Sequence, residues 1–432
     1  MRALCARRLA PLLLGLGLGA LGCASRASRS AWLDRPLQGV AAPEQPCPEQ
    51  PCPEPSVTAP SSADPLAELL RRVAAVRGLE AGPLPTLVEL PAEELARRAR
   101  QQFERDVPEN VRSAQALLLQ RLGLVPSNFD LAAALEVSLP GRLEAFYEGE
   151  PPTLYVAAAL SPADRQRALA HELVHALQDR AHGLTRRLHY APGAWDRQSA
   201  LHALAEADAL AVVERLGLGA SERLPSEEGP ALPGVIERSL AAPYLDARAR
   251  VGELLAQGGF PAVDRALAQP PASTHELLHP DQSAALPALA EVPAPSSAYQ
   301  AVYADVLGEQ SLRGVLEEWA PAEEAAELAS SWAADRVSVF GSDTDVAIVW
   351  ELALQRPRPA ETIARVLVAA LRPGVPARAA APVAEWTCGA DGDGAVVGVL
   401  RQQGRVRFGS FRFATGGGCS ALQVWLRGTW VR

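Results

Sequence analysis

The 432-residue sequence contains no lysine, so all 41 of its basic residues are arginine. This absence argues against functions that depend on a lysine amine, such as Schiff-base chemistry or phosphate binding by a P-loop. The formal net charge is −9, and no cluster of basic residues forms a tract suited to nucleic acid. We therefore expect no nucleic-acid partner.

Cysteine is scarce as well: the chain has six, and none forms a C-x-x-C motif. A structural zinc–thiolate site is therefore not expected. Cys388 and Cys419 flank the last β-like segment, and they could pair in an oxidising compartment.

Long apolar runs are absent after residue 23. Before it, three arginines precede an apolar run that is too short for a membrane span and typical of a secretion signal. The run ends in Ala-Leu-Gly-Cys, which resembles a bacterial lipobox with Ala20 in place of the preferred leucine. We predict a lipoprotein signal peptide over 1–22, and a lipid on Cys23 that anchors the chain to a membrane. Secretion with ordinary cleavage nearby is the alternative. Either process places the protein at the bacterial cell envelope, with the outer membrane favoured, or outside the cell.

The remaining chain changes character twice. Residues 23–63 are rich in proline and repeat the unit PCPEQ/PCPEP, which predicts a disordered tether. Residues 64–380 carry mainly helical periodicity, including stretches at 299–319 and 322–334. Residues 381–432 alternate in RVRFGSFRF and look strand-like in ALQVWLRGTWVR, so we expect a small C-terminal β segment. The predicted fold class is mainly α, with α+β character.

Two strand candidates, Arg142–Tyr147 and Thr153–Ala157, are joined by a Gly/Pro turn just before the chain's most informative helix. A strand in this position can form the edge along which an extended peptide lies, since edge strands offer unpaired backbone groups. A hairpin without that role is equally compatible with the sequence.

The informative helix spans residues 161–183. A serine N-cap, a proline in the first turn and a closing glycine frame it. It carries His171-Glu172-Leu173-Val174-His175, an H-E-x-x-H motif. Two histidines at i and i+4 share one helix face and can bind one zinc ion, while Glu172 can act as general base on the zinc-bound water. Apolar neighbours bury this helix, which favours a metal site over two surface histidines.

Such a zinc site needs a third protein ligand. His182 would lie about 10 Å further along the helix than His175, which is too far to share an ion. The spacing H-E-x-x-H-x-x-G-x-x-H is not met, because Gln178 and Ala181 occupy its glycine and histidine positions. Glu206 fits better: it lies in the middle of the next long helix, after a loop that allows an antiparallel return. The nearby acids Asp208 and Glu214 face elsewhere on that helix or lie two turns away.

HELVHALQD followed by the glutamate of ALAEADA resembles the glutamate-ligand zinc metallopeptidases, the gluzincins. The likeness is greatest to a group of bacterial secreted or lipoprotein metallopeptidases, through PPASTHELLHP, Gly308-Glu309 and SWAADR over roughly residues 70–370. The chain departs from that group's pattern at several positions, none of which is a proposed ligand or the base: Ala207, Ser331, Ala333 and Ala334 replace glycines, and His275-Glu276 replace Glu-Gln.

The resemblance implies that residues 64–380 form a zincin-like catalytic domain that hydrolyses peptide bonds in a peptide or protein substrate. His171, His175 and Glu206 would bind about one zinc ion (Zn2+) per chain. The alternatives are a non-catalytic envelope lipoprotein that retains a zincin scaffold, and a zinc hydrolase of cell-wall amide bonds.

A second H-E-x-x-H stands at His275–His279, but prolines surround it and disfavour a helix. Ser273 followed by Glu276 is the pattern of a capping box, so we expect a helix cap rather than a second zinc. The resemblance aligns His279 with the family's own histidine before proline, and implies that it stabilises the oxyanion of the tetrahedral intermediate. Other donors remain open as alternatives: Tyr147, Tyr155, Tyr244 and Arg336.

Overall fold

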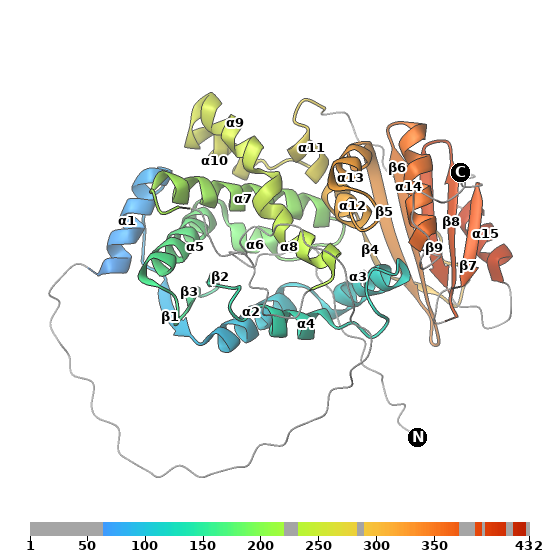
Figure 1. The fold of residues 1–432 in the computed structure, drawn as a ribbon, viewed down its shortest axis with the longest axis horizontal. Coiled ribbons are helices and arrows are strands. Elements are labelled where there is room, and N and C mark those ends of the chain that lie inside the picture. The colour runs from blue at the N-terminus through green and yellow to red at the C-terminus, as the bar shows by residue number, and fades with distance from the viewer. Residues whose placement is uncertain are drawn as a thin grey trace, which may run out of the picture.

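The computed structural model describes residues 64–219, 232–282, 289–370, 385–390, 394–411 and 418–428. The predicted signal peptide (1–22), Cys23, the tether (23–63) and the domain boundary expected after residue 380 lie outside these residues. The described chain is mixed α/β, with most helices gathered at one end and a large antiparallel sheet at the other (Figure 1). None of its described helices is both long and apolar enough to cross a membrane.

The first part of the chain forms the helices expected from its periodicity. They are α1 (Pro65–Arg77), α2 (Ala92–Asp106), α3 (Glu109–Arg121) and α4 (Leu131–Ser138). Asp64 and Asp130 cap α1 and α4 by accepting hydrogen bonds from backbone N–H groups. Buried leucines and alanines on one face of each helix pack into two apolar cores, one of which surrounds the long helices described below.

The expected hairpin is present as β2 (Ala145–Gly149) and β3 (Pro152–Ala157). An additional strand, β1 (Thr86–Leu90), pairs in parallel with β3, so the sheet order is β1-β3-β2. The strand that directly precedes the H-E-x-x-H helix is therefore central. The edges that could receive a peptide are β1 and β2 instead.

Two 21-residue helices, α5 (Pro162–His182) and α7 (Trp195–Arg215), lie against each other in the helical end (Figure 1). Alanines of α7 such as Ala203 and Ala207 are almost fully buried and allow a close approach to α5. Shorter helices surround this pair: α6 (Leu184–Leu188), α8 (Gly234–Asp246), α9 (Arg248–Gly258), α10 (Phe260–Ala268) and α11 (Thr274–Leu278).

The second half of the chain forms a six-stranded sheet of order β4-β5-β6-β9-β8-β7, and its neighbouring strands are antiparallel. Its strands are β4 (Gln300–Asp305), β5 (Trp332–Gly341), β6 (Val346–Leu354), β7 (Trp386–Ala390), β8 (Val396–Gln402) and β9 (Arg405–Phe411). Helices α12 (Gly308–Leu316) and α13 (Ala322–Ala329) separate β4 from β5. The helical expectation over 299–319 and 322–334 is therefore wrong at 300–305 and from Trp332 onward. The C-terminal strands are half of a larger sheet, not a small separate segment.

Helices α14 (Pro357–Ala370) and α15 (Gly418–Gly428) cover opposite faces of this sheet. Val397 and Val399 of β8 share an apolar core with α14, whereas Leu400 shares another core with α15. The strand expected over ALQVWLRGTWVR is wrong for its described part. Leu422, Trp425 and Leu426 recur at helical spacing and are buried against the sheet. Gly409 permits this contact, since a Cβ there would lie 2.8 Å from a methyl group of Leu426.

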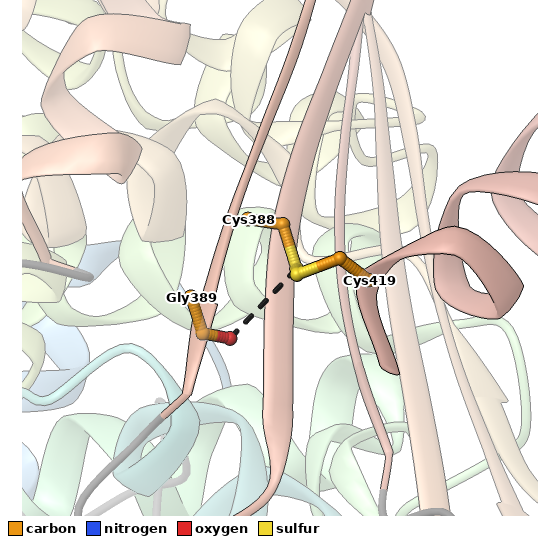
Figure 2. Close-up of a disulfide and its surroundings, with 3 residues drawn as sticks. All are labelled: Cys388, Gly389 and Cys419. Carbon is orange, nitrogen blue, oxygen red and sulfur yellow. Dashed lines mark hydrogen bonds between the residues drawn. A yellow bond between two sulfur atoms is a disulfide. The ribbon is translucent and has the colours of Figure 1, made fainter. Parts of the chain in front are cut away.

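Cys388 of β7 and Cys419 of α15 form a disulfide, which confirms that the two can pair (Figure 2). The bond closes a loop with a sequence separation of 31 residues. A closed loop of this length reduces the conformational entropy of the unfolded chain. We therefore expect the double substitution Cys388→Ser/Cys419→Ser to lower the free energy of unfolding by about 3–4 kcal/mol. Urea denaturation with and without a reductant measures this. The reductant should destabilise the wild type and leave the variant unchanged.

Candidate metal centre

Helix α5 begins and ends as its sequence predicts. Ser161 Oγ accepts a hydrogen bond from the N–H of Asp164 at 3.1 Å, and Gly183 closes the helix in a left-handed conformation with φ 65°. The helix buries every residue from Ala168 to Gln178, so the whole motif is inside the protein. His171 and His175 thus lie one turn apart on a buried face.

The proposed ligands meet between α5 and α7. The Nε2 atoms of His171 and His175 are 3.0 Å apart, and Glu206 Oε2 lies 3.0 Å from the His171 Nε2. The other oxygen of Glu206 lies 3.5 Å from the His175 Nε2. All three residues are buried, and their ligand atoms lie within 4.8 Å of one another. Glu206 therefore lies beside the two histidines, and its role as the third metal ligand stays a prediction.

These separations suit a tetrahedral metal ion. Ligand atoms bound about 2.1 Å from a tetrahedral centre are about 3.4 Å from each other. The His171 Nε2 is 3.0 Å from both the His175 Nε2 and Glu206 Oε2, and the 3.5 Å contact with the His175 Nε2 is made by the other Glu206 oxygen, Oε1. Two imidazole nitrogens and one carboxylate form a donor set that suits zinc and leaves one position for another ligand. The residues present therefore fit a divalent ion of this class.

Glu172 lies beside this cluster and is 1 % exposed. Its carboxylate accepts a hydrogen bond from the backbone N–H of Tyr147 on β2, while its Oε1 has no partner among the described residues. Burial raises the pKa of this carboxyl. An unpaired buried oxygen is costly unless a further group, such as a water, completes its hydrogen bonding.

The electrostatics of the cluster favour positive charge between the carboxylates. Burial by itself lowers the pKa of His175, but Glu206 and Glu172 raise it to about 9. Burial acts to raise the pKa of Glu206, yet His175, His171 and His202 hold it well below its usual value. In the absence of a metal a proton can provide this positive charge, so metal and proton compete for the site.

A buried network holds His175 in place. Its Nδ1 lies 2.9 Å from the Oε1 of Gln178, and the Gln178 amide donates to Ala205 O and Asp208 Oδ2. Arg77 of α1 donates to the same Asp208 oxygen at 2.8 Å. A donor at Nδ1 leaves the Nε2 lone pair of His175 directed at the cluster. Asp208 is therefore a supporting residue and not a ligand, and the sequence offered no signal for the role of Arg77.

Glu206 is also held by a neighbouring side chain. His202, one turn earlier on α7, places its Nε2 3.0 Å from Glu206 Oε1. His182 lies away from the cluster, because its Nε2 contacts Asp264 of α10 at 3.2 Å. This agrees with the expectation that His182 cannot be the third ligand.

A small cavity of about 90 Å3, partly open to solvent, adjoins the cluster. Glu172, His175 and Glu206 line it together with Phe146 and Tyr147 of the edge strand β2. The sheet edge at the wall of this cavity can pair with an extended chain.

The structure corrects the expectation for His279, which does not line this cavity. Its Nε2 contacts Glu309 of α12 at 2.9 Å, in a separate cluster with His275. Of the alternative donors, Tyr147 lines the cavity, and the Tyr244 ring lies 6.4 Å from that of His171. Arg336 is near Glu291, and Tyr155 stacks on Phe146.

Comparisons with models of known protein families, with curated proteins and with solved structures find no match. The functional argument therefore depends on the residues and their geometry.

Proposed function

We propose that this protein is a zinc-dependent metallopeptidase of the glutamate-ligand type, built on a zincin-like domain. The observation that carries the proposal is the convergence of His171, His175 and Glu206 beside a buried carboxylate, Glu172, that has one unpaired oxygen. A site that bound metal only for structure would have no use for such a carboxylate at the wall of a cavity.

When bound, zinc would polarise the substrate carbonyl and lower the pKa of water. Glu172 takes the proton from the attacking water and then donates it to the nitrogen of the leaving amine. The Tyr147 N–H holds one oxygen of Glu172, which leaves the other for this proton transfer. Because Tyr147 belongs to β2, the base lies beside the backbone edge that is available to an extended substrate.

We also propose that the catalytic chain is attached to a membrane of the bacterial envelope through a lipid on Cys23, with residues 23–63 as the tether. The Cys388–Cys419 disulfide supports an oxidising compartment outside the cytoplasm. Incorporation of a labelled fatty acid into the wild type but not into Cys23→Ser tests the anchor.

Metal analysis tests the ligand set. We expect the Glu206→Ala variant to hold one zinc equivalent fewer than the wild type, because two histidines alone bind zinc much more weakly than three ligands. Glu214→Gln, at the exposed end of the same helix, keeps all three ligands and is the control that should retain the ion. An unchanged zinc content in Glu206→Ala would contradict the site.

A substrate panel tests the reaction class. Denatured proteins and peptides should be cleaved by the purified chain, and a chelator should abolish cleavage. Hydrolysis of cell-wall amides without cleavage of peptides would instead indicate the amidase alternative, and no chelator-sensitive hydrolysis of either would favour a binding protein.

A further inference from the structure

We propose a second divalent-metal site, formed by His275, His279 and Glu309, that binds an ion of the zinc class without hydrolytic function. The ligand atoms of these residues lie within 4.8 Å of one another. His275 Nδ1 and Glu309 Oε2 are 2.5 Å apart, and His279 Nε2 and Glu309 Oε1 are 2.9 Å apart. Two imidazoles and a carboxylate are again the donor set of a zinc site.

Two segments distant in sequence create this cluster. The short helix α11 places His275 and His279 one turn apart, and Glu309 lies at the start of α12. Gly308 allows α12 to begin so close to α7 and α11, with φ 82° and only 1.8 Å between its hypothetical Cβ and Asp196 Oδ1. The Gly308–Glu309 pair thus has a physical role: the glycine permits the approach, and the glutamate reaches the histidines.

The site is rigid on one side and accessible on the other. His275 and Glu309 are almost completely buried, whereas the His279 side chain is 25 % exposed. Gln355 holds His275 by placing its amide nitrogen 3.2 Å from the His275 Nε2, on the side of the ring opposite Glu309. The Gln355 nitrogen donates to this Nε2, so binding of a metal at Nδ1 requires the amide to turn and present its oxygen to the Nε2–H. The exposed edge of His279 provides a route by which an ion can enter.

Local charge favours a cation here. Asp196 and Asp335 are buried nearby, and the negative charges of Asp335 and Glu309 act on Asp196. Neither aspartate forms an ion pair in the part of the chain that the structure describes. They receive hydrogen bonds from Thr274 and from backbone and indole N–H groups instead. A divalent ion at Glu309 would offset this concentration of negative charge.

The second motif differs from the first in its glutamate. Glu276 Oε2 accepts a hydrogen bond from the backbone N–H of Ala272, and Ser273 Oγ accepts one from the N–H of Glu276. This is a capping arrangement, so Glu276 is directed at the backbone and is not available as a base. The same H-E-x-x-H motif therefore forms the proposed catalytic centre at 171–175 and the proposed metal site without a general base at 275–279. An ion in the second site would connect α11 to α12, which packs on β5 of the sheet.

Zinc stoichiometry of the full chain tests the proposal. After removal of metal by a chelator and reconstitution with zinc, we expect two equivalents in the wild type and one in either His279→Ala or Glu206→Ala. The variant that combines the two substitutions should hold none. His279 is the most exposed of the three second-site ligands, so its removal should preserve the fold, which circular dichroism and the unfolding midpoint of the chelated protein verify. Glu276→Gln, which can still form the cap, is the matched control and should keep both equivalents.

A second measurement isolates the new site. In the Glu206→Ala background, His275, His279 and Glu309 are the one complete cluster left among the described residues, so added zinc should raise the unfolding midpoint of this variant. The same addition should have no effect when His279→Ala is also present. One equivalent in the wild type, or two equivalents in His279→Ala, would overturn the second site. Loss of one ion in Glu206→Ala would still support the first site in that case, so the two proposals fail separately.

Discussion

Replacing Glu172 by glutamine is expected to reduce the rate of peptide hydrolysis by roughly 10²- to 10⁴-fold, the usual contribution of a general base. Glutamine has nearly the same shape, and its carbonyl oxygen can still accept the hydrogen bond from the Tyr147 N–H. It cannot take a proton from water. His171, His175 and Glu206 are unchanged in this variant, so zinc content should remain that of the wild type.

The chain provides a matched control for this experiment. Glu276 occupies the same place in the second H-E-x-x-H motif but is engaged in a helix cap. Glu276→Gln should therefore hydrolyse the same peptide at the wild-type rate. Initial rates on a defined peptide, with zinc content measured in parallel, compare the variants. Equal loss of activity in both, or none in Glu172→Gln, would contradict the assignment of the base.

The first site could be derived from the sequence because its parts are regular. His171 and His175 lie on one face of a single helix, and capping residues mark both ends of that helix. Glu206 lies on a second long helix, where the angle around the axis separates it from Asp208. When ligands lie within regular helices, spacing alone determines which side chains can meet.

The second site could not be derived in this way. Its third ligand, Glu309, is 30 residues from His279, and the chain between them has no regular pattern that fixes the geometry. The prolines around 275–279 were expected to disfavour a helix, yet the short helix α11 is present with the expected Ser273 cap. The proximity of α12 depends on Gly308 and on tertiary packing. Gln178 and Arg77 were missed for a similar reason, since buried hydrogen-bond partners far apart in sequence leave no periodic signal.

The fold was predicted best where amphipathic helices follow each other. The sheet was underestimated because β6 is buried on both faces, so its apolar run lacks the alternation of a half-exposed strand. The C-terminal helix α15 was mistaken for a strand because its aromatic and β-branched residues favour strands locally. Packing of Leu422, Trp425 and Leu426 against the sheet overrides that preference.

Replacing Arg77 by methionine is expected to destabilise the protein by about 3–5 kcal/mol, the cost of removing one partner of a buried ion pair. Arg77 and Asp208 are both fully buried, and the guanidinium also contacts Asp264 and the ring of Phe260. Methionine can fill much of the space but leaves the Asp208 charge uncompensated. Urea denaturation in the presence of a chelator measures the loss without a contribution from metal.

The exposed pair Arg248–Glu214 provides a control, because a salt bridge on the surface contributes at most about 1 kcal/mol. Arg248→Met should therefore have a small effect. A small effect of Arg77→Met as well would show that the buried pair does not stabilise the fold.

A double-mutant cycle links this ion pair to the metal centre. Asp208→Asn removes the charge that Arg77→Met leaves unpaired, so the double variant should recover more than 1 kcal/mol relative to the sum of the two single losses. Arg77→Met should also weaken zinc binding at the first site by roughly 10- to 100-fold, since Asp208 anchors Gln178 and Gln178 orients His175. Competition with a chelating dye measures this affinity. Loss of stability without any change in zinc affinity would show that the ion pair supports the fold alone, and that His175 keeps its orientation without it.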